Sequence, residues 1–554
     1  MTTIGELSLW VALVMAAWSA VLPPLGIALH RGDLIASGAR AALVAPLFLA
    51  LAVAGLASAL LRGDFSLGYV AAFASANLPP PDRVAALWGA PAGALLVWAL
   101  ALSICTAAVA ARERAPHRSV ALALLGILLT AALAAAALSL RPFARLDWVP
   151  ADGTPGAPAF PTRAAALAPP FLLAGLAAAT VPFALAAPAL ARRTADPTHE
   201  NGARGWALAA WIALTAGLAL AAREWHAAQA GAPGSAALAA WLGTTVLLHA
   251  RRTSGGRRAW PAWAPWVAAA TFAAALAPLA SLPHMGAPGT EGWTYVTLRR
   301  LAIPLGAITL ALLGAGGDGL RWRGADARTW ARRLAWPLAA AMLALGALVA
   351  LGARSVPELL GCALGAFAAA GSARRLAGAA RARDRGGAAG ALAHAGASML
   401  ALAVAGTAMG AEYEGTLRTG QSLAARDGWG REWRFVSDGL SSSRRENFVA
   451  TVVSLTAVRD GRRQALMTSE LRQYVDVRER PVAIPVAAPS VFATPWQDIR
   501  LTLVDAAGED EARVRVAFAP LARWLWYGAA TMLAGGLLGL WPARRRDGGG
   551  TTAG

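Results

Sequence analysis

The chain has 554 residues, of which 57% are hydrophobic, and its formal net charge is +19. A mean hydropathy of +0.49 excludes an ordinary soluble protein and indicates a polytopic membrane protein. The charge does not indicate a nucleic-acid partner, because the basic residues are arginines that lie mostly in short loops between apolar runs, as topology determinants do.

The apolar runs predict an all-α membrane core of about thirteen transmembrane helices. In chain order they fall near 6–29, 39–61, 92–111, 118–139, 167–190, 205–222, 235–250, 262–280, 298–315, 333–352, 356–372, 388–410 and 520–541. The first run has neither the charged start nor the cleavage site of a signal peptide, so we expect residues 1–29 to remain as the first span.

The arginines predict the orientation of these spans. They are concentrated in alternate loops, from the loop at 30–40 to the tail at 544–546. The positive-inside rule places these loops in the cytoplasm. We therefore expect a multi-pass protein of the bacterial inner membrane whose N-terminus and residues 411–519 face the periplasm.

Residues 411–519 differ in composition from the rest of the chain. β-Branched residues alternate or cluster at 449–458, 482–486 and 499–504, between turn signals such as residues 459–461. The predicted organisation is a helical core over 1–410, a small β-rich extracytoplasmic domain over 411–519, a final span over 520–541 and a cytoplasmic tail over 542–554. The β-rich domain contains no histidine or cysteine, so we expect it to serve in docking.

Two histidines near the inner membrane interface form the candidate site. His394 is the only ionisable side chain in the apolar run 386–410, and such groups are functional candidates because they are costly inside a span. His249 ends another apolar run, and both lie within roughly 10 Å of the inner interface at 1.5 Å per residue.

Two imidazoles at matched depth on two helices are the arrangement that a bis-imidazole haem requires. The small residues Ala393, Ala395 and Gly396 are expected to leave room for the flat macrocycle. The alternative is an interfacial His249 and a packed His394 with no ligand between them.

On the outer side, His226 and His284 each follow the end of a span. They form either a second, exposed ligand pair or two ordinary loop histidines. The two cysteines, Cys105 and Cys362, lie in separate apolar runs and indicate packed thiols.

The order of motifs along the chain resembles the CcmF family of cytochrome c-type biogenesis proteins, the membrane haem lyases. The residues that carry the resemblance are 64–71, 77–79, 87–98 with Trp88, Gly89, Gly93 and Trp98, then 142–146, 169–170, 181–184, 247–249, 392–396 and 520–528. The resemblance implies an internal haem b bound by His249 and His394. It also implies a transient haem substrate, taken from a haem chaperone and attached covalently to the CxxCH thiols of apocytochrome c together with other maturation subunits.

The chain departs from the family pattern on the outer side. The tryptophan-rich loop of the family corresponds to the shorter segment 222–235, and Ala168 stands where the family has a histidine. The candidates for contact with the incoming haem are therefore His284, His226, Trp225 and Trp88. No side chain is an obvious general base, so none is assigned a catalytic role.

These departures leave two further functions open. The first is a non-catalytic scaffold or haem-transfer subunit that keeps the inner haem. The second is a transporter, because proline and glycine interrupt several spans, although acidic residues within spans are nearly absent.

Overall fold

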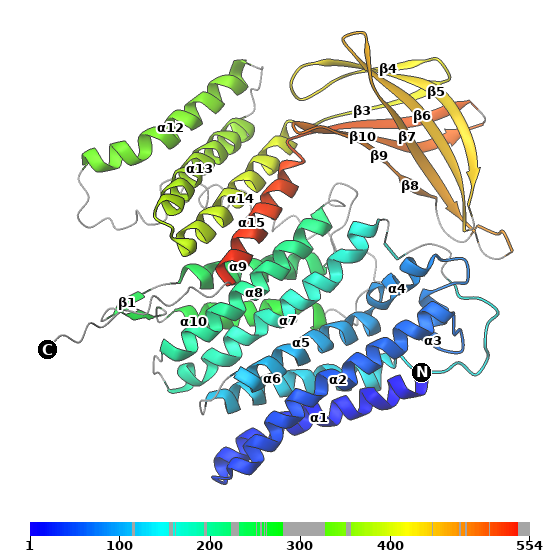
Figure 1. The fold of residues 1–554 in the computed structure, drawn as a ribbon. Helices are drawn as coiled ribbons and strands as arrows, with labels where there is room; N and C mark the ends of the chain where they lie inside the picture. Colours follow the sequence, from blue (N-terminus) through cyan, green and yellow to red (C-terminus); the bar gives the residue numbers. More distant parts are fainter. Residues whose placement is uncertain are drawn as a thin grey trace.

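The computed structural model describes residues 1–112, 117–154, 159–160, 162–192, 197–222, 232–250, 252–254, 257–259, 261, 263–280, 327–350, 356–445, 447–475, 478–481, 485–508 and 510–540. Within these ranges the chain forms two groups of long helices and one β-rich domain (Figure 1). The β-rich domain lies beside the ends of the second helix group, where the chain leaves one membrane helix and enters the last.

The first helix group contains the N-terminal half of the chain. Its members are α1 (Thr2–Ala28), α2 (Gly32–Arg62), α5 (Pro91–Arg112), α6 (His117–Ala134), α7 (Arg163–Arg192), α8 (Pro197–Ala222), α9 (Ala232–His249) and α10 (Ala264–Ala280). Their common core holds large buried side chains such as Leu49, Leu56 and Trp98 among many alanines. Gly5 of α1 and Gly55 of α2 let the first two backbones approach closely, which is how small residues favour helix packing in membranes.

Short elements join these helices. They are α3 (Gly68–Phe73), α4 (Pro80–Gly89), the π-helical turn η1 (Ala135–Leu140) and a hairpin of β1 (Arg252–Ser254) and β2 (Arg257–Ala259). The buried Tyr69 hydroxyl contacts the carbonyl oxygens of Ala86 and Leu87 at 2.9 and 3.0 Å and so holds α3 against α4. The turn η1 continues α6 to the end of the predicted span 118–139. The other elements were not expected from the apolar runs, because each is too short to give a hydropathy signal.

The second helix group contains α12 (Ala327–Ala350), α13 (Val356–Arg381), α14 (Arg385–Ala408) and α15 (Trp524–Leu540). They pack in the order α12, α13, α14, α15, and α15 also packs on α8 of the first group. The last helix therefore joins the two groups (Figure 1).

The β-rich domain is made of two antiparallel sheets. One has the order β3 (Ala411–Arg418), β11 (Glu511–Pro520), β10 (Gln497–Ala507) and β9 (Ser490–Ala493); the other has the order β4 (Ser422–Arg426), β5 (Glu432–Arg444), β6 (Phe448–Arg459), β7 (Arg462–Tyr474) and β8 (Val486–Ala488). Their inward faces share a core that includes Phe435, Leu455 and Phe518. Ala411 pairs with Phe518 in the register of β3 and β11, so the domain begins and ends side by side above α14 and α15.

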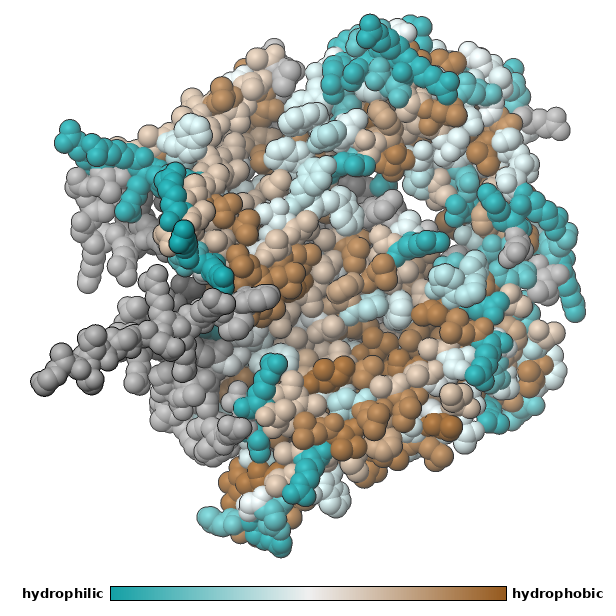
Figure 2. Space-filling model, in the orientation of Figure 1, coloured by the Kyte–Doolittle hydropathy of each residue, from teal (hydrophilic) through white to brown (hydrophobic). Residues whose placement is uncertain are grey.

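The described helices match the predicted spans in position more closely than in number. Eight helices are long and apolar enough to cross a membrane, and three shorter apolar helices run over Ala236–His249, Ala264–Leu276 and Trp524–Leu540. The sequence predicted about thirteen spans. Helix α13 covers its predicted range but is not among the eight helices that could cross a membrane, and the predicted span 298–315 lies outside the described residues. Figure 2 shows hydrophobic side chains over much of the helical surface and hydrophilic ones gathered on the β-rich domain, as a multi-pass membrane protein requires.

Candidate functional site

The structure brings His249 and His394 together across the two helix groups. His249 is the last residue of α9, His394 lies within α14, and their Nε2 atoms are 3.4 Å apart. Among the described elements α9 packs on α7, α8 and α10, whereas α14 packs on α13 and α15. The two histidines therefore meet across a boundary between helix groups, where their own helices do not pack along each other.

The two imidazoles point at each other end to end. Their ring centroids are 5.7 Å apart and their planes differ by 18°. The Nε2 atoms are 3.4 Å apart, which is 2.3 Å less than the distance of 5.7 Å between the ring centroids. Because each ring can contribute no more than its own radius to this difference, the Nε2 atoms can be so much closer only if both lie on the line between the ring centres.

The hydrogen bonding of His249 fixes which of its nitrogens is available. Its Nδ1 atom lies 2.7 Å from the carbonyl oxygen of Thr245, one turn earlier in α9. Because a carbonyl oxygen only accepts, Nδ1 carries the proton and Nε2 keeps a free lone pair. Histidines that bind metals commonly donate their second ring N–H to a backbone carbonyl in this way.

Helix α8 holds α9 in place through two tryptophans. The Trp211 indole donates to the Thr245 hydroxyl at 3.1 Å, and the Trp241 indole donates to the Thr215 hydroxyl at 2.9 Å. The two indoles lie nearly parallel, with ring centroids 6.3 Å apart. Residue Thr245 therefore links the α8 contact to the turn that carries His249, a role that its place in the sequence did not reveal.

The small residues beside His394 have a different role from the one expected. A Cβ atom on Gly396 would lie 2.4 Å from the Gly528 carbonyl oxygen of α15, and one on Gly535 would lie 2.6 Å from the Ala393 nitrogen. Gly396 and Ala393 thus face α15, and the expectation that they leave room for a macrocycle is wrong for these two. They allow α14 to pack tightly on α15.

The donor set fits a haem iron better than a bare metal ion. A structural or catalytic zinc needs three or four protein ligands, whereas an iron porphyrin needs one or two because the macrocycle supplies the rest. Within the described part of the chain there is no group of three or more His, Cys, Asp or Glu side chains that could hold a metal. His249 and His394 would therefore hold the iron, and the macrocycle would supply its remaining ligands.

The candidates for the outer site are less completely placed. Trp225, His226 and His284 lie outside the described residues. Trp88, at the end of α4, is half-buried and its indole donates to the Ala166 carbonyl oxygen at 2.7 Å. Ala168, in α7 close to that contact, is only 3% exposed.

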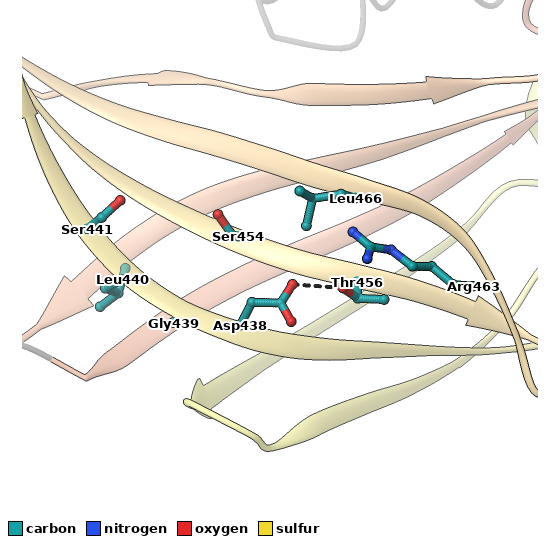
Figure 3. A pocket seen from close by; sticks show the side chains of 8 residues that line it. All are labelled: Asp438, Gly439, Leu440, Ser441, Ser454, Thr456, Arg463 and Leu466. Carbon is teal, nitrogen blue, oxygen red and sulfur yellow. Dashed lines mark hydrogen bonds between the residues drawn. The ribbon is translucent and has the colours of Figure 1, made fainter.

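A separate hollow lies on the β-rich domain, away from the histidines. It has a volume of about 400 Å³ and is lined by residues of β5, β6 and β7. Figure 3 shows Asp438 and Thr456 on its floor, joined by a 2.8 Å hydrogen bond, with Arg463 beside them. The hollow is shallow and polar, and it contributes nothing to the histidine pair.

Comparison with known proteins relates the chain to cytochrome c biogenesis. No protein-family model matches it. It is 33% identical over 275 residues to the cytochrome c-type biogenesis protein CcmF of Escherichia coli strain K12, covering 48% of this chain and 42% of that protein. It is 31% identical over 333 residues to the CcmF of Pseudomonas aeruginosa, covering 56% of this chain and 50% of that protein.

A solved structure named cytochrome c haem lyase CcmF has the same fold. It superposes with a TM-score of 0.75 at 21% identity over 98% of both chains. The chain spans about half the length of the curated relatives that it matches. The chain is thus similar in sequence, over about half its length, to cytochrome c-type biogenesis proteins of the CcmF family, and it has the fold of a solved CcmF structure over nearly its whole length.

Proposed function

We propose that the protein acts in cytochrome c maturation and holds a haem b between His249 and His394. The observation that carries the proposal is the end-to-end approach of the two imidazoles, with both Nε2 atoms directed at one point. His249, in the tautomer set by Thr245, and His394 would be the residues that hold the iron. When bound, the haem supplies one-electron redox chemistry.

The haem would lie between the two helix groups. Its two ligands come from different helix groups, so the surrounding α8, α9, α14 and α15 determine their separation. A gap between helices of a bundle is a common place for a cofactor, because facing helices offer ligands while apolar side chains exclude water.

The second part of the proposal concerns the haem substrate. A haem from a haem chaperone would be presented to apocytochrome c on the periplasmic side, with His284, His226, Trp225 and Trp88 as the contacts. Each CxxCH thiol adds across a vinyl group: the S–H bond and the vinyl π bond break, a carbon–sulfur bond forms at one vinyl carbon, and the hydrogen of the thiol ends on the other. Such an addition depends chiefly on orientation and proximity, which fits a chain without an obvious general base.

The alternative is a non-catalytic role, and two features of the outer side support it. Ala168 offers a buried methyl group where a ligand would be needed, and the Trp88 indole N–H is already bound to Ala166. In that case the protein would keep the inner haem and pass the substrate to a partner subunit.

Two experiments test the proposal. The first is the absorption spectrum of the full chain purified from haem-replete cells, in which a reduced b-type band is expected. The second is co-expression with a haem chaperone and a CxxCH apocytochrome in a host without its own lyase. Covalent c-type haem that depends on this chain supports the enzyme; haem b without covalent product supports the scaffold.

A further inference from the structure

The end of α9 is held by an arginine from the neighbouring helix. The last carbonyl groups of any helix have no partner within the helix. Here the Arg204 guanidinium of α8 donates to the Leu248 carbonyl oxygen at 2.7 Å and to the Ala250 carbonyl oxygen at 3.1 Å. These two carbonyls belong to the residues directly before and after His249.

The position of these carbonyls explains why a clamp is needed. Leu247 is fully buried and Ala250 is 1% exposed, so the chain on either side of Leu248 and the exposed His249 is covered by protein. Buried backbone carbonyls without a hydrogen bond are costly. The guanidinium is a planar fork that reaches two acceptors at once and adds a positive charge at the negative end of the helix dipole.

The clamp acts on the last turn alone. The preceding turn of α9 is attached to α8 by the Trp241–Thr215 hydrogen bond, and Thr245, where the last turn begins, is held by the Trp211 indole. Loss of Arg204 would therefore leave α9 in place while freeing the backbone at the end of this turn, on both sides of the ligand. The direction of the imidazole depends on that turn, because His249 Nδ1 is bound to the Thr245 carbonyl within it.

We propose that Arg204 is a positioning residue, which aims His249 Nε2 at His394 by clamping the two carbonyls that flank the ligand. The inference rests on the proposed haem site, where the direction of both imidazoles decides whether one iron is held by two nitrogens. Loss of the hydrogen-bond partners that orient metal ligands costs about 10–100-fold in metal affinity, and Arg204 acts on the orientation of His249 through its backbone.

The test compares Arg204→Ala with Arg385→Ala, a matched loss of one arginine at the exposed start of the helix that carries His394. Both are made in the full chain and purified with haem. We expect Arg204→Ala to lose the six-coordinate low-spin signature in favour of a five-coordinate high-spin one, with haem retained about tenfold more weakly. Arg385→Ala should have the same spectrum and retain haem as tightly as the unmodified chain.

Two further measurements separate positioning from general damage. In the haem-free protein, hydrogen exchange of residues 244–250 should rise in Arg204→Ala while the earlier part of α9 stays protected. Added imidazole should restore the low-spin signature of Arg204→Ala, because it fills the position that His249 no longer reaches. Arg204→Lys keeps the positive charge but lacks the planar group that donates to both carbonyls. Its spectrum and its haem retention should lie between those of Arg204→Ala and the unmodified chain.

The results that overturn the inference are distinct from those that overturn the haem site. If the unmodified chain shows no six-coordinate haem, the proposed site itself is wrong. If it does, and Arg204→Ala has the same spectrum and the same exchange at 244–250, Arg204 does not position His249. Loss of protection throughout α9, with no recovery in imidazole, would assign Arg204 a general structural role instead.

Discussion

Gly396 and Gly528 face each other across α14 and α15 so closely that neither position has room for a side chain. A Cβ atom on Gly396 would lie 2.4 Å from the Gly528 carbonyl oxygen, and one on Gly528 would lie 2.7 Å from the Gly396 carbonyl oxygen. Because Gly396 is two residues from His394, this approach fixes where α14 presents its imidazole. On its other side α15 meets α8 through Gly536, which lies against Ile212 and Trp211.

Gly396→Ala tests this packing. The added methyl meets backbone atoms that cannot rotate away, so α14 must move, at a cost of about 1–3 kcal/mol. We expect a lower midpoint of thermal unfolding and less bound haem. Gly390→Ala in the same helix is the control, since a Cβ there meets nothing within 4 Å and should be neutral or slightly stabilising. Equal effects of the two changes would contradict the packing argument.

Asp427 lies in the β-rich domain, beside the residue that meets the end of α14. Its side chain is fully buried and accepts hydrogen bonds from Arg431 Nε at 2.9 Å, Trp433 Nε1 at 3.0 Å and Gln497 Nε2 at 3.1 Å. The next residue, Gly428, lies against the Met409 carbonyl at the end of α14. Burial alone would raise the pKa of Asp427, but the hydrogen bonds from Trp433, the Arg431 backbone and Gln497 hold the pKa below its usual value.

This lowered pKa predicts acid sensitivity of the domain. Because the folded-state pKa lies below the unfolded value of about 3.9, Asp427 contributes stability above that pH and loses the contribution as pH falls through the folded pKa. We expect Asp427→Asn to destabilise the protein at pH 7 by about 1–3 kcal/mol and to flatten this part of the pH dependence. Thermal unfolding measured from pH 7 to pH 3 checks both effects. Asp460→Asn, at a side chain 84% exposed, should change neither.

The inner and outer haem sites should be separable by mutation. We expect His284→Ala to keep the reduced b-type band and to lose covalent c-type haem in the co-expression assay, because only the incoming haem would use His284. His226→Gly should also lower the amount of covalent c-type haem in this assay. Unchanged cytochrome c maturation in His226→Gly would show that His226 does not replace the ligand missing at position 168.

Haem should stabilise the contact between the two helix groups. A ligand that binds only the folded protein adds RT ln(1 + [L]/Kd), about 4 kcal/mol at a thousandfold excess over Kd. We therefore expect haem-loaded protein to unfold at a higher temperature than haem-depleted protein. The His249→Ala and His394→Ala variants should gain much less from added haem. An equal gain in all three proteins would mean that haem binds elsewhere.

The sequence predicted the helical spans, the β-rich insertion and the partnership of His249 with His394 because each leaves a local signal. Apolar length gives the spans, β-branched alternation gives the strands, and distance from a span end gives the depth of a histidine. The structure places the two imidazoles 3.4 Å apart, as two histidines at equal depth on neighbouring helices would permit, and their role as haem ligands stays a prediction.

Other features have no local signal. The direction of His249 depends on Arg204, which is 45 positions away in the chain and looks like any arginine at the start of a span. The role of Gly396 depends on its facing Gly528 and Met532 from a helix that follows the whole β-rich domain. Short helices such as α3 and α4 are held by contacts like those of Tyr69, which hydropathy does not register.

The central claim is that one iron is held by imidazoles from α9 and α14. The most direct measurement is the low-temperature electron paramagnetic resonance spectrum of the oxidised, purified full chain, alone and with His249→Ala or His394→Ala. The claim predicts a low-spin six-coordinate signal in the unmodified chain that is lost or becomes high-spin in each single variant. A protein without haem, or a low-spin signal that survives both changes, would contradict it.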